Sequence, residues 1–140
     1  LEKVTVNDVL ESCILSYYAV LTQHNITPQI SVTDKKIERT VNENALSRIF
    51  GNIINNAVKY SDGDLDVSLT EDGTITFSNH AAGLTEVQVG RLFDRFYTVN
   101  TARKSTGLGL SIAKTLTEKM NGTISAAYEN SIIIIRISFP

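Results

Sequence analysis

Residues 42–60, NENALSRIFGNIINNAVKY, carry a long helical pattern in this 140-residue chain. Apolar side chains recur through the stretch at the three- and four-residue steps of an amphipathic helix, and Asn42 has a side chain suited to capping its start. The pattern predicts a helix from Asn42 to about Tyr60. The buried stripe that it predicts consists of Leu46, Ile49, Phe50, Ile53 and Ala57.

Strands are predicted on both sides of this helix. Apolar and polar residues alternate before and after Asp72-Gly73, a dipeptide that favours the tight turn of a hairpin. A second pair of strands meets near Asn130, and its run from Ile132 to Ile135 predicts a strand that is buried on both faces or lies at an edge. The predicted strands are residues 29–33, 36–41, 65–71, 74–79, 123–128 and 132–139.

Three further helices are predicted, over residues 5–24, 85–95 and 109–120. Thr5 or Asn7 could cap the first of them, and Asn121-Gly122 supplies a left-handed stop for the last. Helices and antiparallel hairpins in this order indicate the α+β class. We expect a two-layer sandwich in which about three helices cover one face of a mixed, mainly antiparallel sheet.

Composition limits the possible function classes. The chain is 42% hydrophobic and 20% charged, so residues 1–140 are predicted to form a single globular domain. The net charge of −2 includes no block of like charges, which indicates no nucleic-acid partner. The single cysteine, Cys13, is predicted to be core, and no apolar run is long enough to span a membrane. Because the chain begins at Leu1, it is expected to be part of a longer protein.

The polar face of the 42–60 helix is the first functional signal. Asn52, Asn55 and Asn56 lie within five residues, although asparagine is unfavourable inside a helix. At helical spacing, Asn52, Asn56 and Lys59 fall within about 60° of one another, opposite the apolar stripe. Such a face suits a magnesium-bound polyphosphate, with Lys59 as a point charge. The alternative is an ordinary solvated face.

A glycine pair precedes the 109–120 helix, in residues 105–110, STGLGL. Backbone N–H groups at a helix start are unpaired, so phosphate binds there readily. The segment does not fit a dinucleotide fingerprint, because no strand precedes it and Ile112 replaces the third glycine. The alternative for Gly107 and Gly109 is hinge and N-cap chemistry.

Three motifs resemble, in order, the N, F and G2 boxes of sensor histidine kinases. They are residues 52–60 (NIINNAVKY), 92–97 (LFDRFY) and 106–114 (TGLGLSIAK). The resemblance spans essentially the whole chain. It implies the catalytic ATP-binding domain of these enzymes, a Bergerat-type α/β sandwich like those of gyrase, Hsp90 and MutL.

The resemblance implies an ATP-dependent protein histidine kinase of two-component signalling, which uses ATP and Mg²⁺. Its γ-phosphate would pass to a histidine on a separate dimerisation and phosphoacceptor domain of the same protein, without which this domain would be inactive in transfer. A response regulator would act downstream. The family further implies a cytoplasmic domain of a membrane-anchored bacterial sensor, with no membrane contact by this domain itself.

Carried over residue by residue, the resemblance makes Asn56 the magnesium ligand and, with Lys59 and Arg103, a catalytic residue. Residues 98–105 would form an ATP lid that brings Arg103 to the terminal phosphate. The implied nucleotide-binding residues are Asn52, Asn56, Lys59, Tyr60, Asn79, Gly83, Leu84, Arg103, Thr106, Gly107, Leu108, Gly109 and Leu110.

The chain departs from the family at the G1 box, where D-x-G-x-G is usual and residues 79–83 read NHAAG. Asn79 replaces the aspartate that reads adenine. Its amide oxygen can still accept a hydrogen bond from the adenine amino group, but without charge. Ala81 replaces a glycine, which limits the backbone conformations available there.

This departure leaves a second hypothesis open: a module that keeps the kinase fold, binds no nucleotide and docks a partner through the F-box helix around Phe93 and Phe96. A third, a gyrase- or MutL-like ATPase, is disfavoured. Asn52 stands where those enzymes carry the glutamate that activates water.

Overall fold

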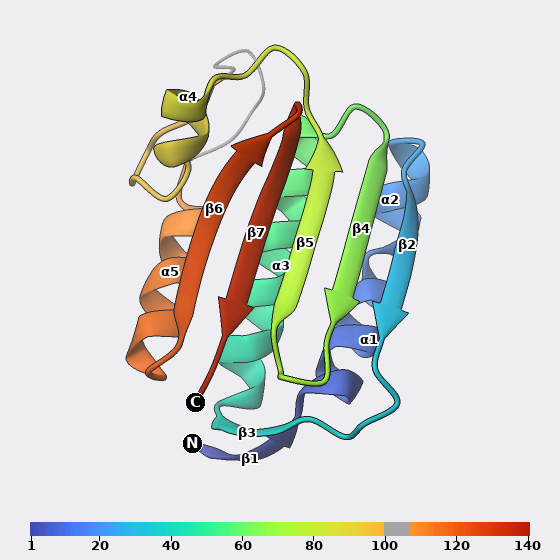
Figure 1. Ribbon diagram of the computed structural model, residues 1–140, viewed down its shortest axis with the longest axis vertical. Helices are drawn as coiled ribbons and strands as arrows, with labels where there is room; N and C mark the ends of the chain where they lie inside the picture. The colour runs from blue at the N-terminus through green and yellow to red at the C-terminus, as the bar shows by residue number, and fades with distance from the viewer. Residues whose placement is uncertain (100–106) are drawn as a thin grey trace.

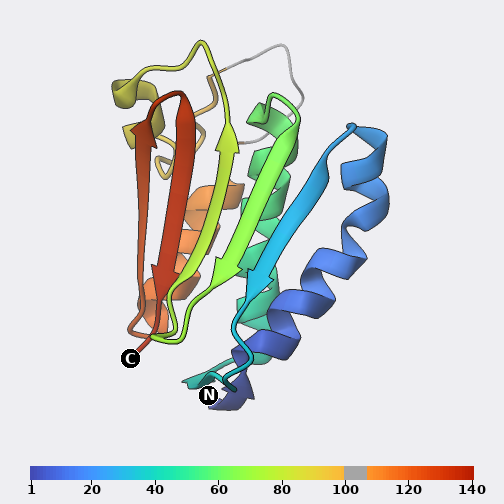
Figure 2. The same ribbon diagram turned by 45° about the vertical axis from the view of Figure 1, so that its right-hand side comes forward.

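The computed structural model describes residues 1–99 and 107–140. A five-stranded sheet has the strand order β2-β4-β5-β7-β6, with only the β2–β4 pair parallel, and helices α1, α3 and α5 lie on one face of it (Figures 1 and 2). The predicted two-layer α+β class is confirmed. The bounds are α1 Val6–Ser16, β2 Thr27–Val32, α3 Glu43–Tyr60, β4 Asp64–Leu69, β5 Ile75–His80, α5 Gly109–Lys119, β6 Thr123–Glu129 and β7 Ile132–Ser138.

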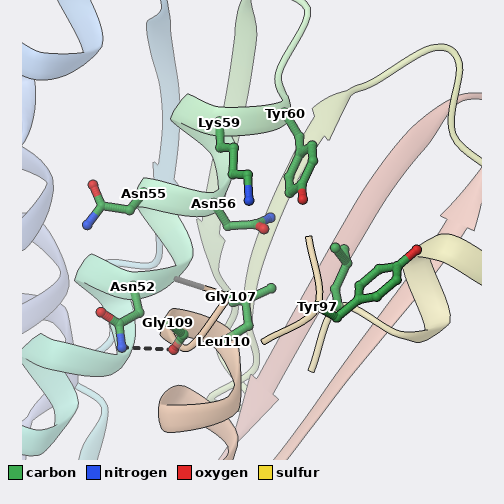
Figure 3. A pocket seen from close by; sticks show the side chains of 10 residues that line it. Asn52, Asn55, Asn56, Lys59, Tyr60, Tyr97, Gly107, Gly109 and Leu110 are labelled. Carbon is green, nitrogen blue, oxygen red and sulfur yellow. Dashed lines mark hydrogen bonds between the residues drawn. The ribbon is translucent and has the colours of Figure 1, made fainter. Parts of the chain in front are cut away.

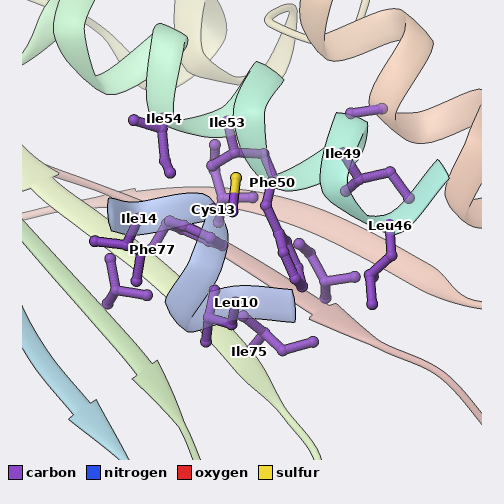
Figure 4. Close-up of a cluster of buried hydrophobic side chains, with 14 of the residues drawn as sticks. Leu10, Cys13, Ile14, Leu46, Ile49, Phe50, Ile53, Ile54, Ile75 and Phe77 are labelled. Atoms are coloured by element: carbon purple, nitrogen blue, oxygen red, sulfur yellow. The ribbon is translucent and has the colours of Figure 1, made fainter. Parts of the chain in front are cut away.

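The apolar stripe predicted for helix α3 is buried in the hydrophobic core. The Asn42 side chain accepts a hydrogen bond from the Ala45 N–H at 2.8 Å and caps the helix. Phe50 is fully buried, and its ring centroid lies 5.9 Å from that of Phe77 on β5. Figure 4 shows Cys13 of α1 in the same cluster, and burial raises the pKa of its thiol to about 11.

Both predicted hairpins form. Between β4 and β5 the turn is longer than two residues: Thr70 donates to the Thr74 carbonyl, and Gly73 adopts a φ of 87°. Hydrogen bonds from the Thr70 hydroxyl and from Thr74 lower the pKa of Asp72 within this turn. Between β6 and β7, Asn130 and Ser131 have φ of 52° and 63°, as a two-residue hairpin turn requires.

The N-terminal prediction needs correction. In place of one helix over residues 5–24, a strand β1 (Glu2–Thr5) precedes α1, and α2 (Tyr18–Gln23) is separate. The Ser16 hydroxyl donates a hydrogen bond to the Cys13 carbonyl at 2.7 Å. The Tyr17 N–H, which would bond that carbonyl in a continuous helix, donates to the Ile14 carbonyl instead. A side-chain bond of this kind competes with the helix ladder and explains the break.

The predicted strands before α3 form, but they lie in different sheets. Strand β2 joins the main sheet, whereas β3 (Glu38–Val41) pairs antiparallel with β1 in a separate two-stranded sheet. Asn7 does not cap α1. Its amide instead bonds the Thr33 carbonyl at 3.1 Å and the Ile37 N–H at 2.8 Å, and so fixes the loop between β2 and β3.

The helix predicted over residues 85–95 is shorter. Helix α4 spans Glu86–Gly90, with Thr85 and Gln88 in a reciprocal capping box, and tight turns follow it. The predicted helix was too long because Leu92, which was counted as part of its apolar face, lies in a turn and is buried there.

Strand β7 lies between β5 and β6, so it is not an edge strand. Ile133 and Ile135 are buried against the helices, whereas Ile132 and Ile134 are half-buried on the open face of the sheet. Burial on both faces is therefore only partial. Among the described residues, no helix has the length and apolar character needed to cross a membrane.

Replacing Phe50 with alanine is expected to lower the free energy of unfolding by about 3–5 kcal/mol, because a fully buried aromatic ring leaves a cavity. Urea denaturation measures the change. The matched control is Val87→Ala, at a side chain that is 73% exposed, with a change within about 0.5 kcal/mol. Similar losses for the two variants would contradict a core centred on α3.

Candidate functional site

A hollow of about 90 Å³ lies between α3 and the start of α5. Figure 3 shows side chains of α3 on one side of it, with the first residues of α5 and Tyr97 on the other. The structure thus brings together most of the predicted N-box and G2-box residues. The hollow is lined by Asn52, Asn55, Asn56, Lys59, Tyr60, Leu92, Tyr97, Gly107, Gly109 and Leu110.

Asn56 is the polar side chain of α3 best placed to receive a ligand. It is 8% exposed, and no hydrogen bond to its amide occurs within residues 1–99 and 107–140. Lys59 is half-buried, and its ammonium lies 5.0 Å from the centroid of the Tyr60 ring, which restricts its position. An amide and a cation therefore share one end of the hollow.

Asn52 has a different environment from Asn56. Its amide nitrogen donates to the Gly109 carbonyl at 2.9 Å, as Figure 3 shows. The bond joins the middle of α3 to the first residue of α5. Asn52 therefore positions the helix start, and one of its two amide N–H donors is used for that bond.

The start of α5 offers backbone N–H groups to the hollow. The N-cap residue, Leu108, supplies no side-chain acceptor to the first turn of the helix. The first N–H groups of a helix have no intrahelical partner, and the helix dipole makes this end positive. The geometry suits an anion across from Lys59.

Gly107 connects the G2 box to the F box. It has a φ of 69°, and a Cβ placed on it would lie 2.5 Å from the Phe96 carbonyl carbon. The Phe96 N–H donates to the Gly107 carbonyl at 2.8 Å. Phe96 itself has a φ of 65°, an unusual conformation for an aromatic residue, and it is 67% exposed.

A second depression, of about 230 Å³, adjoins the first and shares Lys59 and Tyr60 with it. The Tyr60 hydroxyl accepts a hydrogen bond from the Val99 N–H at 3.0 Å. The depression is lined by Lys59, Tyr60, Ser61, Asp62, Ala82, Leu84 and Val99. Tyr60 therefore stands where the two depressions meet.

The unusual G1 box fits the fold without strain. Ala81 is buried, and its φ is not in the left-handed region. Its N–H donates to Ser131, and its carbonyl accepts from the Tyr128 hydroxyl at 2.6 Å. Gly83 keeps a φ of 83° with open space around it, so it is the position of the pair that needs glycine.

Asn79 is 4% exposed, on the helix-covered face of β5, and lines neither depression. Its amide nitrogen donates to the His80 carbonyl at 3.2 Å. Its amide oxygen has no hydrogen-bond partner among the described residues. None of the fully buried side-chain nitrogen and oxygen atoms of these residues lacks a partner, so the Asn79 oxygen is not fully buried. The oxygen is therefore free to accept a bond from a ligand.

Two predicted site residues, Arg103 and Thr106, lie outside the described residues, as does most of the predicted lid. The sequence prediction also omitted lining residues. Tyr97 belongs to the quoted F box, and Asn55 to the asparagine cluster, so the motifs held a signal for both. Ala82 lies in the quoted G1 box and Val99 in the predicted lid, but the sequence did not single out either residue as lining a depression.

The two glycines of the G2 box are expected to respond differently to alanine. Gly107→Ala should lower the free energy of unfolding by about 1–2 kcal/mol or more, because a positive φ is unfavourable for alanine and the added methyl group would collide with the Phe96 backbone. Gly109→Ala should change it by less than about 1 kcal/mol, since the added methyl meets only Asn52 at 3.9 Å. Thermal unfolding compares them. Equal losses would contradict this account of Gly107.

Comparison with known proteins supports a nucleotide-binding family for this fold and site. Residues 41–140 match the family model described as histidine kinase-, DNA gyrase B-, and HSP90-like ATPase. Sensor histidine kinase YcbM of Bacillus subtilis is 36% identical over 132 residues, 88% of this chain and 42% of that protein. Sensor protein VanSC of Enterococcus gallinarum is 33% identical over 140 residues, 94% of this chain and 38% of that protein. The chain spans about two fifths of these curated relatives.

Solved structures show the same fold. The mycobacterial sensor histidine kinase MprB superposes with a TM-score of 0.85 at 21% identity, over 99% of this chain and 96% of that chain. The catalytic domain of histidine kinase ThkA gives 0.84 at 15% identity, over 99% and 95%. With the matched family model and the hollow between α3 and α5, these findings show that the chain belongs to the histidine kinase-, DNA gyrase B-, and HSP90-like ATPase family.

Proposed function

We propose that the two adjoining depressions bind Mg-ATP, and that its γ-phosphate is transferred to a histidine on a dimerisation and phosphoacceptor domain of the same protein. The observation that carries the proposal is the arrangement around the first hollow. The polar face of α3 and the N-terminus of α5 line opposite sides of one space.

The phosphates occupy the first hollow in this proposal. Lys59 supplies positive charge, and the backbone N–H groups of Gly109 and Leu110 bind phosphate oxygens from the helix start. Gly107 and Leu108 form the approach to that helix, and Thr106 continues the same segment. Asn52 keeps α5 in place through the Gly109 carbonyl.

The residues present fit a magnesium ion shared with the phosphates. Asn56 is largely buried and unpartnered within the described part of the chain, and an amide oxygen is a suitable hard ligand. One protein ligand suffices, because magnesium keeps several waters and takes the rest of its ligands from phosphate. The ion would neutralise phosphate charge, and Asn56 would hold it.

The base occupies the second depression. Tyr60 and Leu84 offer apolar surface there, and Gly83 leaves open space beside it. Asn79 does not line this depression, so in the proposed complex the base reaches beyond the lining residues to the Asn79 amide oxygen, which accepts a hydrogen bond from the adenine amino group. Val99, whose N–H donates to the Tyr60 hydroxyl, lines the same depression.

Phosphoryl transfer needs positioning and charge neutralisation more than covalent chemistry from this domain. Lys59 and Arg103 act on the phosphates, and the acceptor histidine comes from a part of the protein outside this chain. A response regulator receives the phosphate afterwards. One relative is named a sensor histidine kinase and the other a sensor protein, which supports a sensor role. In this proposal other segments anchor the bacterial sensor in a membrane, with this domain in the cytoplasm.

The second candidate, a partner-docking module without nucleotide, is favoured by one observation. Phe96 is 67% exposed at the end of the F-box turn, and Phe93, three residues earlier, is only half-buried. An exposed aromatic side chain is a suitable docking residue. Phosphorylation of a supplied histidine-bearing domain by this chain would exclude a purely docking role.

Asn56→Ala is expected to weaken Mg-ATP binding at least about tenfold and to abolish its dependence on magnesium, because the metal ligand is lost. Isothermal titration calorimetry with and without magnesium measures both. The control is Asn44→Ala, an exposed position in the first turn of the same helix, where binding should be unchanged. Magnesium-dependent binding retained by Asn56→Ala would contradict the assigned ligand.

Asn79→Asp is expected to tighten ATP binding by about three- to tenfold, because a carboxylate makes a stronger, charge-assisted bond to the adenine amino group. Binding of GTP should not improve, since its oxygen at the equivalent position repels a carboxylate. Calorimetry with both nucleotides separates the effects. If neither affinity changes, Asn79 does not contact the base. If neither the wild type nor Asn79→Asp binds nucleotide, the docking module becomes the better account.

A further inference from the structure

A polar clasp joins the end of α3 to the G1 segment, outside the residues carried over from the family. We define the clasp as Asp62, Asp64 and His80. The Asp62 carboxylate accepts from the Ala82 N–H at 2.8 Å, and the Asp62 N–H donates to the His80 carbonyl at 2.8 Å. The Asp64 carboxylate accepts from the His80 N–H at 2.8 Å and lies 2.7 Å from the ring Nδ1.

The loop that carries the aspartates is itself fixed. The Ser61 hydroxyl accepts from the N–H groups of Gly63 and Asp64, both at 2.9 Å, and the Ser61 N–H donates to the Ala57 carbonyl at the end of α3. The loop is therefore fixed to the end of α3, the helix that carries Asn56 and Lys59. The clasp extends this frame to the G1 segment.

The segment held by the clasp leads into the second depression. Ala82 and Leu84 line that depression, and so does Asp62. On the far side, Ala81 is bonded to the β6–β7 hairpin through Ser131 and Tyr128. Residues 80–82 are thus held from both sides, with the clasp fixing the side nearer to α3.

We propose that Asp62 and Asp64, acting through His80 and the Ala82 backbone, are positioning residues that hold the base end of the site in register with its phosphate end. The inference rests on the proposed nucleotide function. It assigns a role to residues that the motifs did not identify, and it explains how an altered G1 box keeps a defined shape.

Within the clasp, His80 and Asp64 form an ion pair when the His80 ring is protonated. Asp64 raises the pKa of His80 by its hydrogen bond and then by its charge, and Asp62 and Asp66 add to the effect. Burial raises the pKa of Asp64, but bonds and charge from His80 and a bond from Ser61 outweigh it, so the net shift is downward. Across the sheet, His80 is paired with Ile132, which is opposite Glu129 on β6.

The direction of the pH effect follows from these shifts. His80 has a raised folded pKa, so its contribution is complete below its ordinary value of 6.5 and is lost as pH rises through the raised value. Asp64 has a lowered folded pKa, so its contribution is lost only in acid. Because His80 and Asp64 are substantially exposed, we expect nucleotide affinity to fall only about two- to fivefold across the His80 transition.

Three variants separate the contacts. Asp62→Ala removes the acceptor of the Ala82 N–H, whereas Asp62→Asn keeps an acceptor without charge. Asp64→Asn keeps an acceptor for the His80 N–H but removes the charge beside the ring. The control is Asp66→Asn, an exposed carboxylate on the same strand as Asp64 that makes no hydrogen bond to residues 80–84 within the described residues.

The test combines nuclear magnetic resonance with calorimetry on the 140-residue chain. Without nucleotide, Asp62→Ala should shift the amide resonances of Ala82 to Leu84 and speed hydrogen exchange at Ala82 about tenfold, with rescue by Asp62→Asn. With Mg-ADP, Asp62→Ala should weaken binding about three- to tenfold. Asp64→Asn should remove the pH dependence of affinity above 6.5, and Asp66→Asn should retain it.

Unchanged resonances at Ala82 in Asp62→Ala would overturn the proposal, and so would shifted resonances with unchanged Mg-ADP affinity. The nucleotide-free measurement keeps the two proposals apart. If the wild type binds no Mg-ADP while Asp62→Ala moves Ala82 to Leu84, the proposed function fails and the positioning of this segment by the clasp stands.

Discussion

Burial of one face of α3 is the constraint on which the rest of the structure depends. The helix must place Phe50 and its apolar neighbours against the sheet, and that fixes its rotation about its own axis. Once the rotation is set, Asn56 and Lys59 point into the hollow shared with α5. The same packing that stabilises the domain therefore orients its candidate ligand-binding groups.

The second level of organisation is a set of polar links made to α3. The amide of Asn52 reaches the Gly109 carbonyl and fixes the start of α5. At the other end of the helix, the loop with Asp62 and Asp64 reaches the G1 segment. Each link joins a different part of the candidate site to one helix, so the two ends of the site are held in a fixed relation to each other.

The sequence predicted what depends on periodicity and on motif chemistry. The 42–60 pattern identified α3 and its cap, and Asp72-Gly73 and Asn130 marked the two hairpins. It missed strand β1, whose four residues carry no distinct alternation, and the break at Tyr17, which depends on the Ser16 hydroxyl bond to Cys13. Ala82 and Val99 lie in segments that the sequence identified, but their place in the wall of the second depression depends on tertiary packing and could not be predicted residue by residue.

In the proposed complex, one nucleotide spans both depressions, with its phosphates at α3 and α5 and its base beside the G1 segment. Mapping amide resonance changes during a titration with Mg-ADP tests it most directly. The account predicts changes at two groups, residues 56–60 with 109–110, and residues 82–84. Changes confined to one group, or centred on the distant α1–β2 side around Leu15 and Ile30, would contradict it.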